Sequence, residues 1–124
     1  MSNMMVVDGD TGFSELVSKH FMSLNFGVIR ASNGREAGTY MKTRSDIDVI
    51  LLGTNMPDMD GIETLRHILS LDPSAQVIVM TDEVSTDDAL DALKMGAFVY
   101  CWKPFDINRL AEKVEKAAAS KHTM

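Results

Sequence analysis

Acidic, hydroxyl and amine side chains stand directly after four short apolar runs of the sequence. Carboxylates such as those of Asp8 and Asp10 are the ligands that a hard divalent cation prefers, together with water and phosphate oxygens. Ser, Cys and His residues show no spacing that pairs a nucleophile with a base, which argues against hydrolytic catalysis. The segments that could form a site are Asp8–Thr11, Gly53–Pro57, Thr81–Glu83 and Trp102–Phe105.

The elements that position these segments are predicted by the spacing of apolar residues. Short continuous runs alternate with longer stretches in which apolar residues recur every three or four positions. The runs predict strands and the stretches predict amphipathic helices. Strands that are apolar throughout belong in a parallel sheet covered on both faces. The predicted strands are Met4–Val7, Val28–Ala31, Val49–Leu52, Val77–Met80 and Phe98–Cys101.

The predicted helices fill the intervals between these strands. The first has Phe13, Val17 and Leu24 on its apolar stripe, and Asp106 can cap the last. The helices are expected over Phe13–Leu24 and Arg35–Lys42, from Gly61 to before Pro73, over Thr86–Met95, and from Ile107 to about Ala118.

This alternation predicts an α/β fold with a doubly wound five-stranded parallel sheet. Right-handed crossovers and the strand order 2-1-3-4-5 would make it flavodoxin-like. Binding sites in such sheets lie beyond the carboxyl ends of the strands, which is where the polar segments fall. The 124 residues, 45% hydrophobic and 24% charged, predict one globular domain at residues 4–119 and a loose tail at 120–124.

A series of short motifs lies at the ends of the predicted strands. In order, they are Val6-Val7-Asp8-Gly9-Asp10, Ile50-Leu51-Leu52-Gly53, Met56-Pro57-Asp58-Met59-Asp60-Gly61, Val79-Met80-Thr81, Gly96-Ala97, and Tyr100 followed by Lys103-Pro104-Phe105. Together they resemble the receiver domain of bacterial response regulators in two-component signalling. The likeness runs from about Met4 to Ala118, and the ordered set of motifs makes it specific.

The resemblance implies a role for each matching residue. Asp8 corresponds to the first of two acids that hold a magnesium ion, and Asn55 to a residue whose backbone carbonyl also binds it. Thr81 and Lys103 correspond to the hydroxyl and the amine that hold the phosphoryl oxygens. Thr81 and Tyr100 correspond to a switch that reports phosphorylation to the surface.

Two positions depart from the family pattern. Gly53 replaces the aspartate that accepts the phosphoryl group from a histidine kinase, and Gly9 replaces the second metal-binding acid. The resemblance therefore implies a pseudo-receiver, since glycine has no side chain to phosphorylate. Magnesium dehydrates reluctantly, so a vestigial site of Asp8, Asp10 and backbone oxygens predicts weak or absent binding and no cofactor.

Several residues near the motifs also have plainer interpretations. Asp58 and Asp60 are the nearest other carboxylates to the acceptor position, but acids in such a loop usually cap the following helix or face solvent. Lys103 beside Asp8 equally fits a structural ion pair, and Tyr100 equally fits a plain strand aromatic.

Composition limits the expected partners and compartment. A net charge of −6 argues against direct binding to nucleic acid, which needs clustered Lys and Arg. Apolar runs such as Val49–Leu52 are far too short to span a membrane, and the N-terminus lacks the layout of a secretory signal. The single Cys101 suits a reducing compartment. We therefore expect a cytoplasmic protein.

The sequence is interpreted as a non-enzymatic signalling module that acts through protein contacts. A kinase, an output domain or a second receiver is expected to meet the face of the fourth helix, fifth strand and fifth helix, which receivers commonly present. A receiver from a working phosphorelay with its two aspartates substituted is one alternative. A flavin or phosphate site at Asp10–Ser14 is another, although Asp8 and Asp10 would repel a phosphate.

Overall fold

A parallel sheet forms the centre of the computed structural model, which describes residues 2–54, 56–82, 85–103 and 106–121. Its strand order is β2-β1-β3-β4-β5, and each neighbouring pair is parallel. The strands are β1 (Asn3–Val7), β2 (Gly27–Ala31), β3 (Val49–Gly53), β4 (Val77–Thr81) and β5 (Val99–Trp102). The predicted fold class and strand order are confirmed, and each predicted strand lies within one residue of its place.

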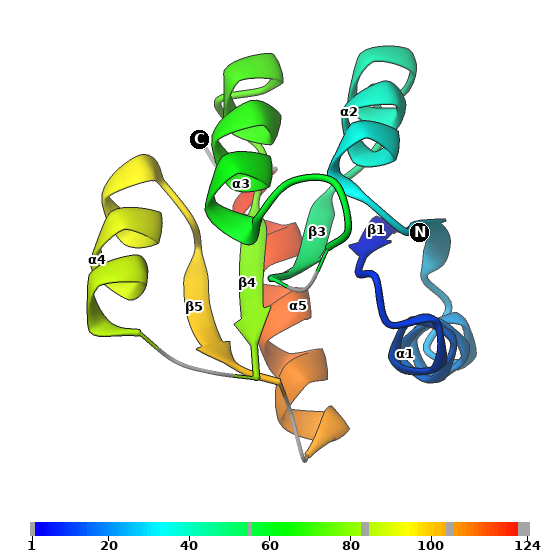
Figure 1. Ribbon diagram of the computed structural model, residues 1–124. Helices are drawn as coiled ribbons and strands as arrows, with labels where there is room; N and C mark the ends of the chain where they lie inside the picture. Colours follow the sequence, from blue (N-terminus) through cyan, green and yellow to red (C-terminus); the bar gives the residue numbers. More distant parts are fainter. Residues whose placement is uncertain (1, 55, 83–84, 104–105, 122–124) are drawn as a thin grey trace.

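Helices cover both faces of the sheet. α2, α3 and α4 pack on one face, while α1 and α5 pack on the other (Figure 1). The helices are α1 (Thr11–Ser23), α2 (Gly34–Thr43), α3 (Gly61–Leu71), α4 (Thr86–Met95) and α5 (Ile107–Lys121). This arrangement leaves the carboxyl ends of the strands open to solvent or a partner.

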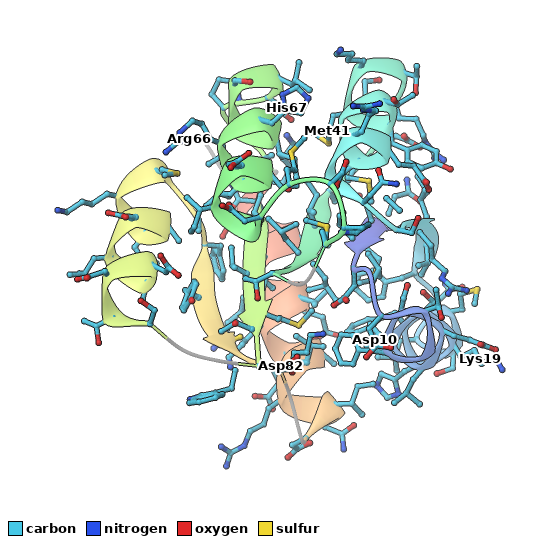
Figure 2. The ribbon with its side chains drawn as sticks, in the orientation of Figure 1. Asp10, Lys19, Met41, Arg66, His67 and Asp82 are labelled. Carbon is cyan, nitrogen blue, oxygen red and sulfur yellow. The ribbon has the colours of Figure 1, made fainter. Side chains whose placement is uncertain are left out.

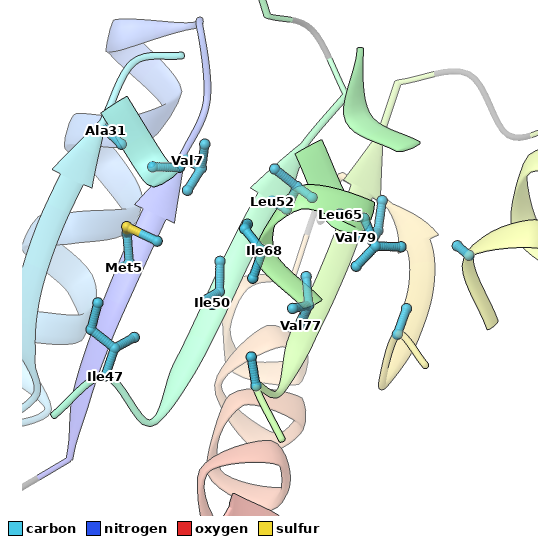
Figure 3. Packing of buried hydrophobic residues seen from close by; sticks show 14 residues of the cluster. Met5, Val7, Ala31, Ile47, Ile50, Leu52, Leu65, Ile68, Val77 and Val79 are labelled. Carbon is cyan, nitrogen blue, oxygen red and sulfur yellow. The ribbon is translucent and has the colours of Figure 1, made fainter. Parts of the chain in front are cut away.

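Alternation along the strands divides the core into two clusters. In β3, Ile50 and Leu52 face α3, where they meet Leu65 and Ile68 (Figure 3). The neighbouring Leu51 faces the other way, toward α1 and α5. Because both faces are covered, all five residues of β3 are buried, which explains why the run is apolar throughout. Burial of each large side chain stabilises the fold by about 1.5–3 kcal/mol.

Short polar side chains fix where the helices begin. Each accepts a hydrogen bond from a backbone N–H of the first turn, a contact that stabilises a helix by about 1 kcal/mol. The caps are Asp10 for α1, Asn33 for α2, Asp60 for α3 and Ser85 for α4. Asp106, the expected cap of α5, accepts from the Asn108 N–H at 3.0 Å.

The end of α5 differs from the sequence expectation. Residues 120 and 121, assigned there to a loose tail, continue the helix, and residues 122–124 lie outside the described part of the chain. The Lys121 Nζ lies 2.7 Å from Asp72 Oδ2 and 2.8 Å from Ser74 Oγ. This anchor to the loop between α3 and β4 explains the longer helix. A pairing between residues so far apart cannot be predicted from a sequence pattern.

Candidate functional site

Four of the predicted site residues meet at the carboxyl edge of the sheet. Asp8 follows β1, Gly53 ends β3, Thr81 ends β4 and Lys103 follows β5. Asp8 is 1% exposed and Thr81 4% exposed, so these polar groups are buried at the edge of the sheet rather than placed on its outer surface. Figure 2 shows Asp10 and Asp82 at this end, while Met41 and His67 lie at the opposite end.

Asp8 and Lys103 form an ion pair at this edge of the sheet. The Lys103 Nζ lies 3.1 Å from Asp8 Oδ2 and 3.4 Å from Oδ1, and the lysine side chain is only 11% exposed. Asp82 Oδ2 lies 3.8 Å away, and the Phe13 ring centroid 4.6 Å away. Since an unpaired buried charge is strongly unfavourable, each partner of the central pair depends on the other.

The Asp8 carboxylate also fills the space beside Gly53. Its Oδ1 accepts the Asp10 N–H at 2.9 Å, while its Oδ2 faces the Gly53 Cα. A β-carbon at position 53 would overlap Asp8 Oδ2 and lie 2.6 Å from Asp8 Cγ. A side chain at position 53 would therefore force the Asp8 carboxylate out of its present place.

Sequence reasoning identified both residues but not this relationship. The strand register places the two residues together. Val7 of β1 pairs with Leu52 of β3, so Asp8 and Gly53, the next residues along the two strands, are neighbours. The order 2-1-3 makes such adjacency predictable. The direction of the Asp8 side chain depends on Lys103, which is brought in from β5.

A second pair of side chains links β3 to β4. The Thr54 Oγ1 donates a hydrogen bond to Thr81 Oγ1 at 2.9 Å. The Thr81 carbonyl in turn accepts the Lys103 N–H at 2.8 Å, which connects β4 to the end of β5. Thr54 lies in the predicted segment Gly53–Pro57, but its contact with Thr81 was not predicted, because nothing in a lone threonine after a strand indicates its partner.

The residues expected at a vestigial metal site have other partners. The Asp8 carboxylate contacts Lys103, and Asp10 is exposed and accepts the Phe13 N–H at 3.1 Å as the cap of α1. Gly9 is exposed, and Asn55 lies outside the described residues. Within the described ranges, no group of three or more His, Cys, Asp or Glu residues is placed to hold a metal ion. The residues that the structure describes at this edge do not gather the carboxylates that a magnesium site would need.

The two other acids near the acceptor position cap helices. Asp60 accepts the Glu63 N–H at 2.7 Å, as expected for the following helix. Asp58 instead accepts the N–H groups of Gly34 and Arg35, both at 2.9 Å, and so adds a second capping contact to α2 beside that of Asn33. Although desolvation raises the pKa of Asp58, these backbone donors hold it below its ordinary value.

The switch candidates lie beside a groove of about 730 Å³ between α3 and α4. Thr54, Thr81 and Tyr100 line it together with Arg66 and Asp88. Tyr100 is half-buried and packs against the core cluster on this face of the sheet. The sequence motif continues into residues 104–105, which lie outside the described part of the chain.

The fold and this site define a class of protein, a flavodoxin-like domain with a lysine, a threonine and an aspartate at the carboxyl edge of its sheet. Residues 4–115 match the family model described as the response regulator receiver domain. The chain belongs to the receiver domain family of two-component signalling.

Relatives from several organisms share this domain. The chain is 34% identical over 122 residues to the transcriptional regulatory protein ZraR of Escherichia coli, covering 98% of this chain and 27% of ZraR. It is also 34% identical over 121 residues to the chemotaxis protein CheY of Listeria monocytogenes, covering 95% of this chain and 99% of that protein. The chain thus spans about a quarter of the length of ZraR and nearly all of CheY.

Solved structures show the same fold. A CheY-like receiver domain from Methanospirillum hungatei superposes with a TM-score of 0.93 at 23% identity, covering 98% of this chain and 97% of that one. A CheX-CheY-BeF3-Mg complex from Borrelia burgdorferi gives 0.86 at 30% identity, with coverages of 93% and 87%. Among the described residues, no helix is long and apolar enough to cross a membrane.

Proposed function

We propose that this chain is a pseudo-receiver, a non-enzymatic interaction module that works without phosphorylation at the family's acceptor position. The observation that carries the proposal is the contact between Asp8 and Gly53. The acceptor position has no side chain, and the Asp8 carboxylate fills the space where one would begin. Lys103, which resembles the lysine that holds a phosphoryl group, has Asp8 as its anion instead.

The charge balance around Asp8 supports independence from magnesium. A pocket that holds several carboxylates needs a cation, because like charges in a partly dry site raise one another's pKa. Here one buried carboxylate faces one ammonium group, and the more exposed Asp82 lies farther away. The pair can persist without an added ion, so we expect magnesium binding to be weak or absent and no cofactor to be needed.

The face formed by α4, β5 and α5 is our candidate partner surface. Leu90 and Leu93 of α4 and Trp102 of β5 are exposed, the tryptophan by 58%. Beside Trp102, a cavity of about 320 Å³ is lined by Leu110 and by cationic groups that include Arg109. Exposed apolar groups with charges around them are typical of protein contact sites. A kinase, an output domain or a second receiver in the cytoplasm would fit this surface.

A working phosphorelay receiver with two substituted aspartates is the second candidate. Its support is that Thr81 and Lys103 still lie at the neighbouring strand ends that a phosphoryl group would need. The flavin or phosphate module has less support, because the Asp10 carboxylate already caps the N-terminus of α1. A phosphate there would meet that negative charge.

Incubation with magnesium and acetyl phosphate, followed by intact mass measurement, tests the proposal. The wild-type chain is expected to gain no phosphoryl group, and its amide NMR spectrum should show no saturable change around Asp8 and Gly53 on magnesium titration. Phosphorylation or tight saturable shifts would overturn the proposal.

The double variant Gly9→Asp with Gly53→Asp distinguishes the two candidates. Phosphorylation of this variant would show that the pocket is otherwise intact, as the phosphorelay alternative requires. An inert but folded variant would support the pseudo-receiver, because Asp8 must leave its present position before a side chain at 53 can fit.

A further inference from the structure

The hydrogen bond between Thr54 and Thr81 joins the acceptor strand to the residue that resembles the family's switch hydroxyl. The two Oγ1 atoms lie 2.9 Å apart in a part-buried site. Thr54 follows Gly53 directly, so it stands beside the position where the phosphoryl group of a relative would be attached. The hydroxyl of Thr54 therefore reaches Thr81 from the residue next to the acceptor position.

Thr54 also packs against the start of α3. A β-carbon on Gly61 would lie 2.7 Å from Thr54 Cγ2 and 3.0 Å from Thr54 Cα. Gly61, the first residue of α3, therefore leaves room for the Thr54 methyl group, and the hydroxyl extends toward Thr81. The side chain is thus held at both of its branches.

Thr81 connects this contact to the proposed partner surface. It pairs in register with Trp102 across β4 and β5, and its carbonyl accepts the Lys103 N–H at 2.8 Å. Thr54, Thr81 and Tyr100 also line the same groove between α3 and α4. A displacement of Thr81 would therefore change the surroundings of the exposed Trp102 and of the half-buried Tyr100.

We infer that Thr54 is a positioning residue that holds Thr81 in place of a phosphoryl group. The Asp8 carboxylate pairs with Lys103, and the Thr54 hydroxyl bonds to Thr81, so each of these residues has a partner where a phosphoryl oxygen would otherwise bind. The two contacts together fix the carboxyl ends of β4 and β5 in one arrangement. This inference rests on the proposed phosphate-independent function and identifies the residue that sets the state of its partner surface.

Two matched variants separate a role of the hydroxyl from a role in packing. Thr54→Val keeps both branches but removes the hydroxyl, while Thr54→Ser keeps the hydroxyl and removes the methyl group beside Gly61. The chain has one tryptophan, so the fluorescence of Trp102 reports on the end of β5 without labelling. Backbone amide NMR at Thr81 and Tyr100 gives the second measurement, in magnesium-free buffer.

We expect Thr54→Val to shift the Trp102 emission and the Thr81 amide resonance, with Thr54→Ser close to wild type. The reverse order would show that the methyl packing matters and would overturn the inference, as would wild-type spectra from both variants. Thr81→Val removes the same contact from the other side and should reproduce the change if Thr54→Val fails to fold. Adding acetyl phosphate and magnesium to the wild type tests the proposed function separately, by mass.

Discussion

The carboxylate of Asp8 lies in the space that a β-carbon at position 53 would occupy. Asp8 is held there by the Lys103 ammonium group at 3.1 Å and by the Asp10 N–H at 2.9 Å. With these two partners, the short Asp8 side chain has little freedom to move away from position 53. The ion pair and the glycine therefore depend on one another.

Gly53→Ala is expected to destabilise the fold, because the new methyl group displaces the Asp8 carboxylate from Lys103. Overpacking of this kind costs about 1–3 kcal/mol in the free energy of unfolding, measurable by urea denaturation. Gly12→Ala is the matched control, since a β-carbon there meets only Asp10 Oδ1, at 3.5 Å. Equal stabilities for the two variants would contradict the packing at Gly53.

Asp8→Asn should destabilise the chain by about 3 kcal/mol, because it leaves the Lys103 ammonium group buried without its closest anion. Lys103→Met should have a comparable effect, and the double variant should be less destabilised than the sum of the two. Glu15→Gln removes one partner of the exposed pair with Lys19 and should change stability little. Strict additivity at Asp8 and Lys103 would show that the pair is not coupled.

Lys121→Met tests the anchor at the end of α5 through its pH dependence. Burial raises the pKa of Asp72, but hydrogen bonds from Lys121 and Ser74 outweigh it and leave the pKa below its ordinary value. The contribution of a carboxyl with a lowered pKa is present above the unfolded value of about 3.9 and is lost as pH falls through the folded value.

Thermal melting of wild type and Lys121→Met should therefore differ at neutral pH and converge in acid, below about pH 4. Lys116→Met, on the exposed side of the same helix, should melt with the wild type throughout. A difference that persists undiminished at low pH would mean that packing, rather than the ion pair, holds the helix end.

Cys101 should react slowly with a disulfide reagent at pH 8. Burial raises the pKa of its thiol, with the charge of Lys113 acting in the opposite direction, so the folded chain holds less thiolate than a free cysteine at that pH. Lys113→Met should slow the labelling further. Complete and rapid reaction after addition of denaturant is the control, and a rate as fast as free cysteine in the folded chain would contradict the burial.

Much of the fold could be predicted because burial on both faces leaves a direct mark on the sequence. Val49–Leu52 is apolar at every position because helices cover both sides of β3. Asp60 and Asp106 were predictable as caps, since the cap and its helix are neighbours in sequence. Capping contacts could therefore be predicted where the two residues are close in sequence.

Apart from the pair of Asp8 and Lys103, which the family resemblance suggested, contacts between distant segments could not be predicted in this way. Asp58 caps α2 rather than the helix that follows it, and Thr54 bonds to a residue at the end of the next strand in the sheet. Lys121 continues α5 through an anchor some fifty residues earlier in the chain. Each depends on side-chain directions that only the folded sheet defines.

The space shared by Asp8 and position 53 also limits how this chain can change. An aspartate introduced at 53 by a single substitution would meet a carboxylate already held by Lys103, so it would lower stability unless Asp8 moved. An acidic side chain at this position therefore requires the ion pair between Asp8 and Lys103 to rearrange as well.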